Sequence, residues 1–265
     1  MTTARPFSLD LEATSYSYVE RANHVLVKLV GEYLDRAARA PLVLDVGCGC
    51  GGNARAIRER SPDAKLHGIE PNARAAELAR EVCDVVHHGT TETWVKKHEA
   101  QSYDVVVLAD VLEHIADPVA FLRQLAADPA VRDAHWVISV PNYAVWYNRI
   151  RTLFGIFEYT WSGLYDRTHL RFYTRHSVQR LLTECGFEII EDRCSPSLVQ
   201  SAAPLLRRFF EKEVSEGNHL ALGESSAYRV YEKTIEPLER AACQVWPELL
   251  GFQIVTVAKL AKGGA

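Results

Sequence analysis

The sequence predicts an α/β protein built on a doubly wound, seven-stranded sheet that is mostly parallel, with an antiparallel last strand. Five short apolar segments before residue 142 alternate with segments that have helical spacing of apolar residues, which is typical of a parallel sheet with crossover helices. The first apolar segment, at 42–46, ends in a glycine-rich loop. The segment at 104–109 is apolar at nearly every position, as expected for a central strand that is buried on both faces.

The individual elements follow from these patterns in chain order. Apolar residues at helical spacing predict a first helix over 16–39, which Pro41 ends. Asp117 and Pro118 are a typical helix start, and Thr174 is expected to cap a helix that ends at Gly186. The predicted strands lie at 42–46, 65–69, 84–87, 104–109, 135–140, 187–192 and 252–260. The predicted helices between them lie at 53–60, 72–81, 91–98, after 117 and after 174.

The chain divides into a sheet domain and several additions. Residues 41–195 and 252–265 form the predicted sheet domain, and residues 1–40 form a helical cap before it. Residues 142–173 are rich in aromatic side chains; this insert is either a pocket for a planar or lipid-like ligand or the core of a small lid. Residues 196–251 are predicted to be mainly helical, as a lid or as a surface for a homodimer or another partner.

Composition disfavours several classes of protein. The 265 residues carry a net charge of −4, so no strong positive field attracts nucleic acid, and we expect no nucleic-acid partner. No apolar run approaches the roughly 18 residues that a membrane-spanning helix needs. The N-terminus lacks the apolar core of a signal peptide. We therefore expect a cytoplasmic protein without a membrane span.

The cysteines and histidines show no metal-binding pattern. The six cysteines contain no CxxC pair, and Cys48 and Cys50 are interpreted as small side chains of the glycine loop. His87 and His88 are neighbours on a predicted strand, so they point in opposite directions and make a poor chelate. We expect no bound metal.

The glycine loop supports two interpretations. Gly47, Gly49 and Gly52 fit the G-x-G-x-x-G pattern of dinucleotide-binding loops, and Glu70 ends the next predicted strand, which favours a nicotinamide-dependent oxidoreductase. Asp45 argues against this because a carboxylate two residues before the first glycine opposes a pyrophosphate. The same carboxylate attracts a ligand with positive charge, such as S-adenosylmethionine with its sulfonium and ammonium groups.

Three segments, in order along 40–142, resemble motifs of the class I S-adenosylmethionine-dependent methyltransferases. Residues 43–51 are similar to the first motif, residues 68–70 to the second, and residues 104–114 to the segment of the fourth strand. The resemblance implies a Rossmann-like fold and an enzyme that binds S-adenosylmethionine and releases S-adenosylhomocysteine. The Leu112-Glu113-His114 ending is similar to the branch that acts on small molecules such as quinone precursors, sugars and secondary metabolites.

The resemblance also implies the cofactor contacts. Asp45 shapes the site for the amino-acid end of the cofactor, and Glu70 holds the ribose hydroxyls. The acid that commonly binds the adenine amino group is missing after the third strand, where Thr90 or Glu92 stands instead. The predicted cofactor residues are Asp45, Gly47, Cys48, Gly49, Gly51, Asn53, Glu70, Pro71, Thr90, Thr91, Ala109, Asp110 and Val111, with Tyr18 folding over the cofactor from the N-terminal segment.

Two segments contain candidates for the catalytic base. His114 follows the fourth strand and acts either as a base or as a structural residue of the next turn. Asp166 and His169 are three residues apart, so on a helical turn the carboxylate would orient the imidazole as a base. The alternative is a clasp that holds the aromatic insert to the sheet. Residues 166–173 are similar to a segment of methyltransferases that sit beside glycan-assembly enzymes.

These observations predict an enzyme that transfers a methyl group to a hydroxyl, amine or carbon of a small molecule, such as a sugar, a glycolipid or a secondary metabolite. Two alternatives stay open from the residues. One is a nicotinamide-dependent oxidoreductase that uses the same loop. The other is a non-catalytic scaffold protein that binds S-adenosylmethionine.

Overall fold

The computed structural model describes residues 22–37, 39–96, 101–160, 163–196, 234 and 236–261. The strands are β1 (Leu42–Val46), β2 (Lys65–Glu70), β3 (Val85–His88), β4 (Val105–Ala109), β5 (His135–Pro141), β6 (Phe187–Pro196) and β7 (Gly251–Leu260). The helices are α1 (His24–Leu34), α2 (Gly52–Arg60), α3 (Ala73–Ala79), α4 (Thr91–Val95), α5 (Pro118–Ala126), α6 (Trp146–Leu153), α7 (Arg175–Glu184), α11 (Glu236–Val245) and α12 (Pro247–Leu250), with short 3-10 turns η1 (Leu112–His114) and η2 (Pro129–Val131). None of these described helices is long and apolar enough to cross a bilayer.

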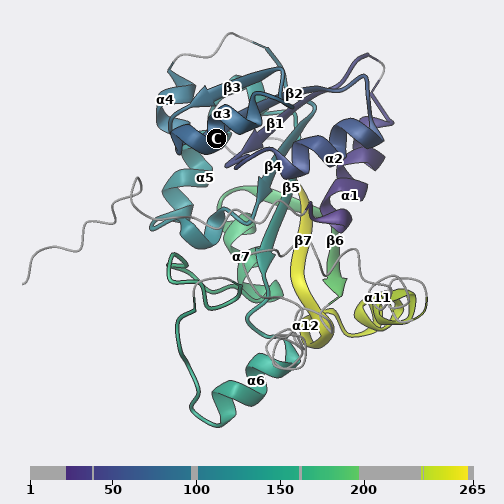
Figure 1. Cartoon of the computed structure of the whole chain (residues 1–265), viewed down its shortest axis with the longest axis vertical. Helices are drawn as coiled ribbons and strands as arrows, with labels where there is room; N and C mark the ends of the chain where they lie inside the picture. The colour runs from purple at the N-terminus through teal and green to yellow at the C-terminus, as the bar shows by residue number, and fades with distance from the viewer. Residues whose placement is uncertain are drawn as a thin grey trace, which may run out of the picture.

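The strands form one sheet in the order β3-β2-β1-β4-β5-β7-β6 (Figure 1). The first five strands pair in parallel, whereas β7 runs antiparallel to both of its neighbours, β5 and β6. Strand β6 therefore runs in the same direction as the first five. The predicted class, a seven-stranded and mostly parallel sheet with an antiparallel last strand, is confirmed.

The order of the strands reverses between β1 and β4. The chain moves outward from β1 to β3 and then returns to the other side of β1 to form β4 and β5. Because parallel crossovers are right-handed, this reversal places α2 on one face of the sheet and α5 on the other. In open α/β sheets, ligands bind beyond the carboxyl ends of the strands at such a reversal, which here lies at β1 and β4.

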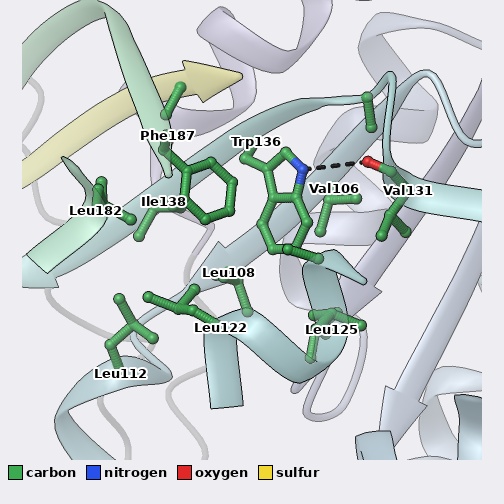
Figure 2. Packing of buried hydrophobic residues seen from close by; sticks show 14 of the residues in the cluster. Val106, Leu108, Leu112, Leu122, Leu125, Val131, Trp136, Ile138, Leu182 and Phe187 are labelled. Atoms are coloured by element: carbon green, nitrogen blue, oxygen red, sulfur yellow. Dashed lines mark hydrogen bonds between the residues drawn. The ribbon is translucent and has the colours of Figure 1, made fainter. Parts of the chain in front are cut away.

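Alternate residues of the central strands build a separate core on each face of the sheet. Val43, Val105 and Val107 pack in the core that includes α1 and α2. Residues that point the other way form a core with α5 and α7, and Figure 2 shows part of it around Trp136. The Trp136 indole N–H donates to the Val131 carbonyl at 3.3 Å, so this large ring is buried without an unsatisfied polar group. The two-residue period of the strands thus determines both cores.

Helix ends follow the capping residues that the sequence indicates. The Asp117 carboxylate accepts a hydrogen bond from the Ala120 N–H, with Pro118 in the first turn of α5. The Thr174 hydroxyl accepts from the Ser177 N–H at the start of α7. Gly186, with φ of 87°, follows the end of the same helix. The helices predicted after 117 and 174 are confirmed.

Some boundaries differ from those predicted. The first helix is expected over 16–39, but α1 spans His24–Leu34, and residues 16–21 lie outside the described residues. Strand β6 continues to Pro196, which pairs with Gly251 of β7. Residues 196 and 251, the two ends of the segment predicted as a helical insert, therefore belong to the sheet, where they pair with each other across β6 and β7. Within the insert, α11 and α12 are helical as expected, and residues 197–233 lie outside the described residues.

The core around α5 predicts the effect of one substitution on stability. Leu122 is fully buried between α5 and the sheet, so Leu122→Ala should lower the free energy of unfolding by about 2–5 kcal/mol. Leu153 on α6 is 81% exposed, so the same change there should alter it by less than about 0.5 kcal/mol. Urea denaturation followed by circular dichroism measures both. Equal effects of the two substitutions would contradict the described core.

Candidate active site at the carboxyl edge of the sheet

The loop after β1 lies over the carboxyl edge of the sheet. Its glycines Gly47, Gly49 and Gly51 have positive φ angles of 72°, 54° and 85°. A Cβ atom at Gly47 would lie only 2.8 Å from Val111 Cγ2, so glycine at this position lets the loop contact the turn after β4. The glycine loop, defined as residues 47–51, thus packs against the turn after β4.

The backbone amides of the glycine loop are used inside the protein. The N–H groups of Gly47 and Cys48 both donate to the Ile69 carbonyl, at 2.8 and 3.1 Å. The Gly49 N–H donates to a carboxylate oxygen of Glu70 at 2.9 Å. A loop that binds pyrophosphate directs its amides at the phosphate oxygens. In this loop the Gly49 amide is instead bonded to the Glu70 carboxylate, and a carboxylate at this position favours a positively charged ligand.

Asp45, at the carboxyl end of β1, is the second acid beside the loop. It is 2% exposed, and within the described part of the chain neither of its carboxylate oxygens has a hydrogen-bond partner. Burial, together with the nearby negative charge of Glu70, raises the pKa of Asp45 to about 7. A buried carboxylate without partners destabilises the fold. A positively charged ligand at this point would remove that cost.

The end of β2 places the predicted ribose and adenine residues side by side. The Glu70 carboxylate accepts hydrogen bonds from the Gly49 and Asn72 amides, both at 2.9 Å. The Gly89 N–H donates to the Glu70 carbonyl, which holds the following turn with Thr90 and Thr91 against this strand. The structure therefore places these residues at the same edge of the sheet, and their contacts with a cofactor stay predictions.

Asp110 follows β4 and has a strained backbone. Its φ of 55° is positive, which among the described residues is otherwise seen in glycines alone. Its carboxylate accepts hydrogen bonds from the Ser139 hydroxyl at 3.1 Å and from the Gln253 side-chain amide at 2.5 Å. Burial raises the pKa of Asp110 to about 6 even with these two donors. Strain held in place by neighbouring strands is typical of a functional position.

The partners of Asp110 could not be predicted from the sequence. The Gln253 side-chain oxygen accepts a hydrogen bond from Asn23 at 3.1 Å, and the Asn23 backbone N–H donates to the Asn53 side chain at 2.9 Å. A polar side chain near the start of the apolar segment 252–260 was the available signal for Gln253. Its position opposite Asp110 depends on the antiparallel register of β7 against β5, which local sequence does not specify. The side-chain oxygen of Asn53, predicted to bind cofactor, is already occupied in this network.

Glu113, His114 and His169 converge beside the glycine loop. One potential ligand atom from each residue lies within 4.8 Å of the others, and the two imidazole rings are 4.9 Å apart. The backbone amides of Leu170 and Arg171 both donate to the Glu113 carbonyl, at 2.7 and 3.0 Å, which ties the aromatic insert to η1. Burial lowers the pKa of His114 to about 4 and also lowers that of His169. Both rings are therefore neutral at pH 7.

The predicted orientation of His169 by Asp166 is wrong. The Asp166 carboxylate accepts hydrogen bonds from the backbone N–H and the hydroxyl of Thr168, at 2.8 and 2.6 Å. The His169 Nδ1 atom instead lies 3.1 Å from the Leu164 carbonyl. Residues 163–169 form successive turns and not a helix, so a spacing of three does not place two side chains on one face. The geometry agrees with the alternative, a clasp that holds the insert to the sheet.

The aromatic insert, residues 142–173, forms a cluster of rings next to this clasp. Neighbouring centroids among Tyr143, Phe157, Tyr165 and Phe172 lie 5.1–6.5 Å apart. Tyr165 is buried, whereas Phe157 is 45% exposed, so the cluster is a small core with one open side. Phe172 also contacts the His169 ring, at 6.4 Å between centroids. A role of the open side toward a ligand stays a prediction.

The other predicted cofactor residues occupy different positions. Cys48 contributes its backbone, because its Sγ is buried beneath the loop, where an added Cβ at Gly68 would lie 2.6 Å away. Pro71 is exposed at the bend after β2, and Ala109 is partly buried at the end of β4. Tyr18 lies outside the described residues.

A family model described as a methyltransferase domain matches residues 18–192, which is more than half of the chain. The chain belongs to this family. The methyltransferase is 32% identical over 114 residues to a ubiquinone biosynthesis O-methyltransferase of Vibrio campbellii, covering 40% of this chain and 44% of that protein. A ubiquinone biosynthesis O-methyltransferase of Nitrosospira multiformis is 29% identical over 173 residues, covering 60% and 68%. The methyltransferase thus spans less than half the length of the Vibrio relative that it matches.

Solved structures share the fold of the methyltransferase. A SAM-dependent methyltransferase from Archaeoglobus fulgidus superposes with a TM-score of 0.50 at 18% identity, covering 88% of this chain and 94% of the other. A plantazolicin methyltransferase in complex with a substrate analog and SAH gives a TM-score of 0.52 at 15% identity, with 89% and 83% covered. At this identity the comparisons show the Rossmann-like fold alone.

The residues at the carboxyl edge fit S-adenosylmethionine, the cofactor of this class I methyltransferase family. The buried, unpartnered carboxylate of Asp45 suits the positive charge of that cofactor. The Gly47, Cys48 and Gly49 amides already donate within the protein, so they are not directed at a pyrophosphate. Because the chain belongs to a methyltransferase family, the interpretation as a nicotinamide-dependent oxidoreductase is wrong, although the glycine spacing alone allowed it.

The crowding at Gly47 predicts a selective loss of cofactor binding. Gly47→Ala would place a Cβ against Val111, so the affinity for S-adenosylhomocysteine should fall at least about tenfold. Gly155 has a similar φ of 69° but open space around it, so Gly155→Ala is the matched control for backbone strain alone. Isothermal titration calorimetry measures both affinities. Equal affinities of the two variants would show that the contact with Val111 is unimportant.

Proposed function

We propose that this protein transfers a methyl group from S-adenosylmethionine to an oxygen atom of a small-molecule acceptor. The observation that carries the proposal is the pair of buried carboxylates, Asp45 and Glu70, beside a glycine loop whose amides are bonded internally. The bound cofactor supplies a methyl carbon that its sulfonium activates. The protein itself therefore has to bind the cofactor and the acceptor, align them and exclude water.

Two acids have different roles in the cofactor half of the proposed site. Asp45 offsets positive charge at the amino-acid end, and Glu70, fixed by two amides, accepts the ribose hydroxyls. The backbone from Ala109 to Val111 borders the methionine part, because the strained Asp110 turn lies next to the glycine loop. Thr90 and Thr91 lie beside Glu70 on the adenine side.

The acceptor half lies at His114 and His169, between η1 and the aromatic insert. Each Nδ1 atom lies close to a backbone carbonyl, of Thr168 at 3.2 Å and of Leu164 at 3.1 Å. Because a carbonyl only accepts, Nδ1 carries the hydrogen and Nε2 carries the lone pair. An acceptor hydroxyl must lose its proton during transfer, and lone pairs at this position favour that. The Vibrio and Nitrosospira relatives are O-methyltransferases by name, which supports oxygen as the accepting atom.

Of the insert at 196–251, α12 lies at the same edge of the sheet as the acceptor half. Asn142, directly after β5, donates through its side chain to the carbonyls of Glu248 at 2.9 Å and Gly251 at 2.8 Å. These bonds hold α12 at the same edge of the sheet as the glycine loop. The role of residues 196–251, as a lid or as a dimer surface, stays a prediction. A sugar, a glycolipid or a secondary metabolite stays the predicted class of acceptor.

Labelled S-adenosylmethionine tests the proposal. The protein should bind the cofactor and transfer label to a hydroxylated acceptor from a panel of phenols, sugars and glycolipids, with products identified by mass. Glu70→Ala should weaken cofactor binding at least about tenfold, because two charge-assisted contacts are lost. Tight binding without transfer to any acceptor would favour the scaffold interpretation over an enzyme. Absence of binding would contradict the whole proposal.

The raised pKa of Asp45 predicts that cofactor affinity depends on pH. The unliganded carboxyl is protonated below about pH 7, whereas a cationic cofactor favours the charged carboxylate. Affinity should therefore rise about tenfold between pH 6 and pH 8, as the proton no longer has to be expelled. Calorimetry with S-adenosylmethionine at several pH values measures this.

Asp45→Asn is the matched variant for this pH dependence. It should flatten the pH profile and weaken binding at pH 8. Because a raised pKa makes ionisation of Asp45 destabilise the folded state above pH 7, the same variant should make the unliganded protein more stable at pH 8. A pH profile unchanged by the substitution would show that another group controls binding.

A further inference from the structure

The cluster of Glu113, His114 and His169 has the composition of a metal site. It contains two imidazoles and one carboxylate, with potential ligand atoms within 4.8 Å of one another. His87 and His88, considered from the sequence, offer no such site, and His87 Nε2 lies 2.8 Å from the Thr93 hydroxyl. His169 lies 55 positions after His114, so a local spacing pattern could not indicate the cluster.

Both imidazoles are oriented as metal ligands usually are. The Nδ1 atoms of His114 and His169 lie 3.2 and 3.1 Å from the carbonyls of Thr168 and Leu164. A metal-bound histidine typically donates its second ring N–H to a carbonyl in this way, which fixes the ring and leaves the other nitrogen for the metal. The two carbonyls belong to the same clasp, so both rings are positioned by one rigid segment.

Glu113 provides an independent observation that points to a cation. Glu113 is 1% exposed, and in the part of the chain that the structure describes neither of its carboxylate oxygens has a hydrogen-bond partner. An isolated buried carboxylate is strongly unfavourable. A divalent ion next to this carboxylate would satisfy both oxygens and offset the negative charge.

We propose that Glu113, His114 and His169 hold a divalent first-row transition-metal ion beside the cofactor loop. Imidazole nitrogens favour such ions over magnesium and calcium, which prefer all-oxygen ligand sets. Three protein ligands leave at least one coordination position open, as in catalytic metal sites. Ligand atoms of a bound ion are about 3.3 Å apart, so binding would draw the three side chains slightly together.

The position of the ion gives it a role in the proposed function. Val111 contacts the glycine loop on one side and immediately precedes η1 with Glu113 and His114. His169 contacts Phe172 of the aromatic cluster. With the ion bound, the Nε2 lone pairs would be its ligands, and the ion would act in their place by lowering the pKa of an acceptor hydroxyl bound at the open position. This role rests on the proposed function, whereas metal binding itself does not.

Calorimetric titration of the EDTA-treated, cofactor-free protein with zinc chloride tests the site. We expect one zinc ion per chain and no comparable binding of magnesium. His169→Asn should weaken zinc binding more than about 100-fold. Glu113→Gln, which keeps the size of the side chain, should also weaken zinc binding. Cobalt(II) should give visible absorption bands of a histidine-bound ion in the wild type, and these bands should disappear in His169→Asn.

His176 on α7 is exposed and provides the matched control for adventitious binding to surface histidines. His176→Asn should bind zinc as the wild type does. Circular dichroism without metal verifies that each variant folds. Absence of saturable zinc binding in the wild type, or equal binding by the wild type, His169→Asn and Glu113→Gln, would overturn the proposed site.

The titration is independent of the cofactor. S-adenosylhomocysteine binding is measured separately on the same samples. Zinc binding without cofactor binding would contradict the proposed function and support the metal site. Cofactor binding without zinc binding would support the proposed function and contradict the metal site.

Discussion

Buried negative charge dominates the carboxyl edge of the sheet. Asp45, Glu70, Asp110 and Glu113 all lie where β1, β2 and β4 end, and burial raises the pKa of three of them, Asp45, Asp110 and Glu113. Their desolvation is unfavourable, so the two apolar cores have to provide the stability that this edge lacks. A positively charged ligand would interact favourably with these carboxylates, so its binding would stabilise the fold. Binding and stability are thus linked at the same atoms.

The turn after β4 connects the two halves of the site. Asp110 is held by Ser139 and Gln253, Val111 contacts the glycine loop, and Glu113 accepts backbone hydrogen bonds from the aromatic insert. These contacts fix a strained backbone between the cofactor loop and the clasp. In the proposed site, the distance between the methyl donor and its acceptor therefore depends mainly on one short segment, 109–114.

The fold could be predicted from local patterns because each pattern has a local cause. Short apolar runs predicted the strands, and Asp117 and Thr174 marked helix starts through their own hydrogen bonds. The acid before the glycines distinguished between two cofactors, since charge acts at short range. The partnership of Gln253 with Asp110 and the meeting of His169 with Glu113 could not be predicted. Both depend on the register between distant segments, and the expected helical turn at 166–169 misplaced Asp166.

Strand β7 has a consequence for how the protein is made. It lies between β5 and β6, although it is the last strand to leave the ribosome (Figure 1). Until residues 251–260 emerge, β5 and β6 each expose an unpaired edge, which is a template for aggregation. Gln253 also reaches Asp110 only at that moment. A nascent chain that stops early is therefore an incomplete sheet without a finished site, and a candidate for chaperones and proteases.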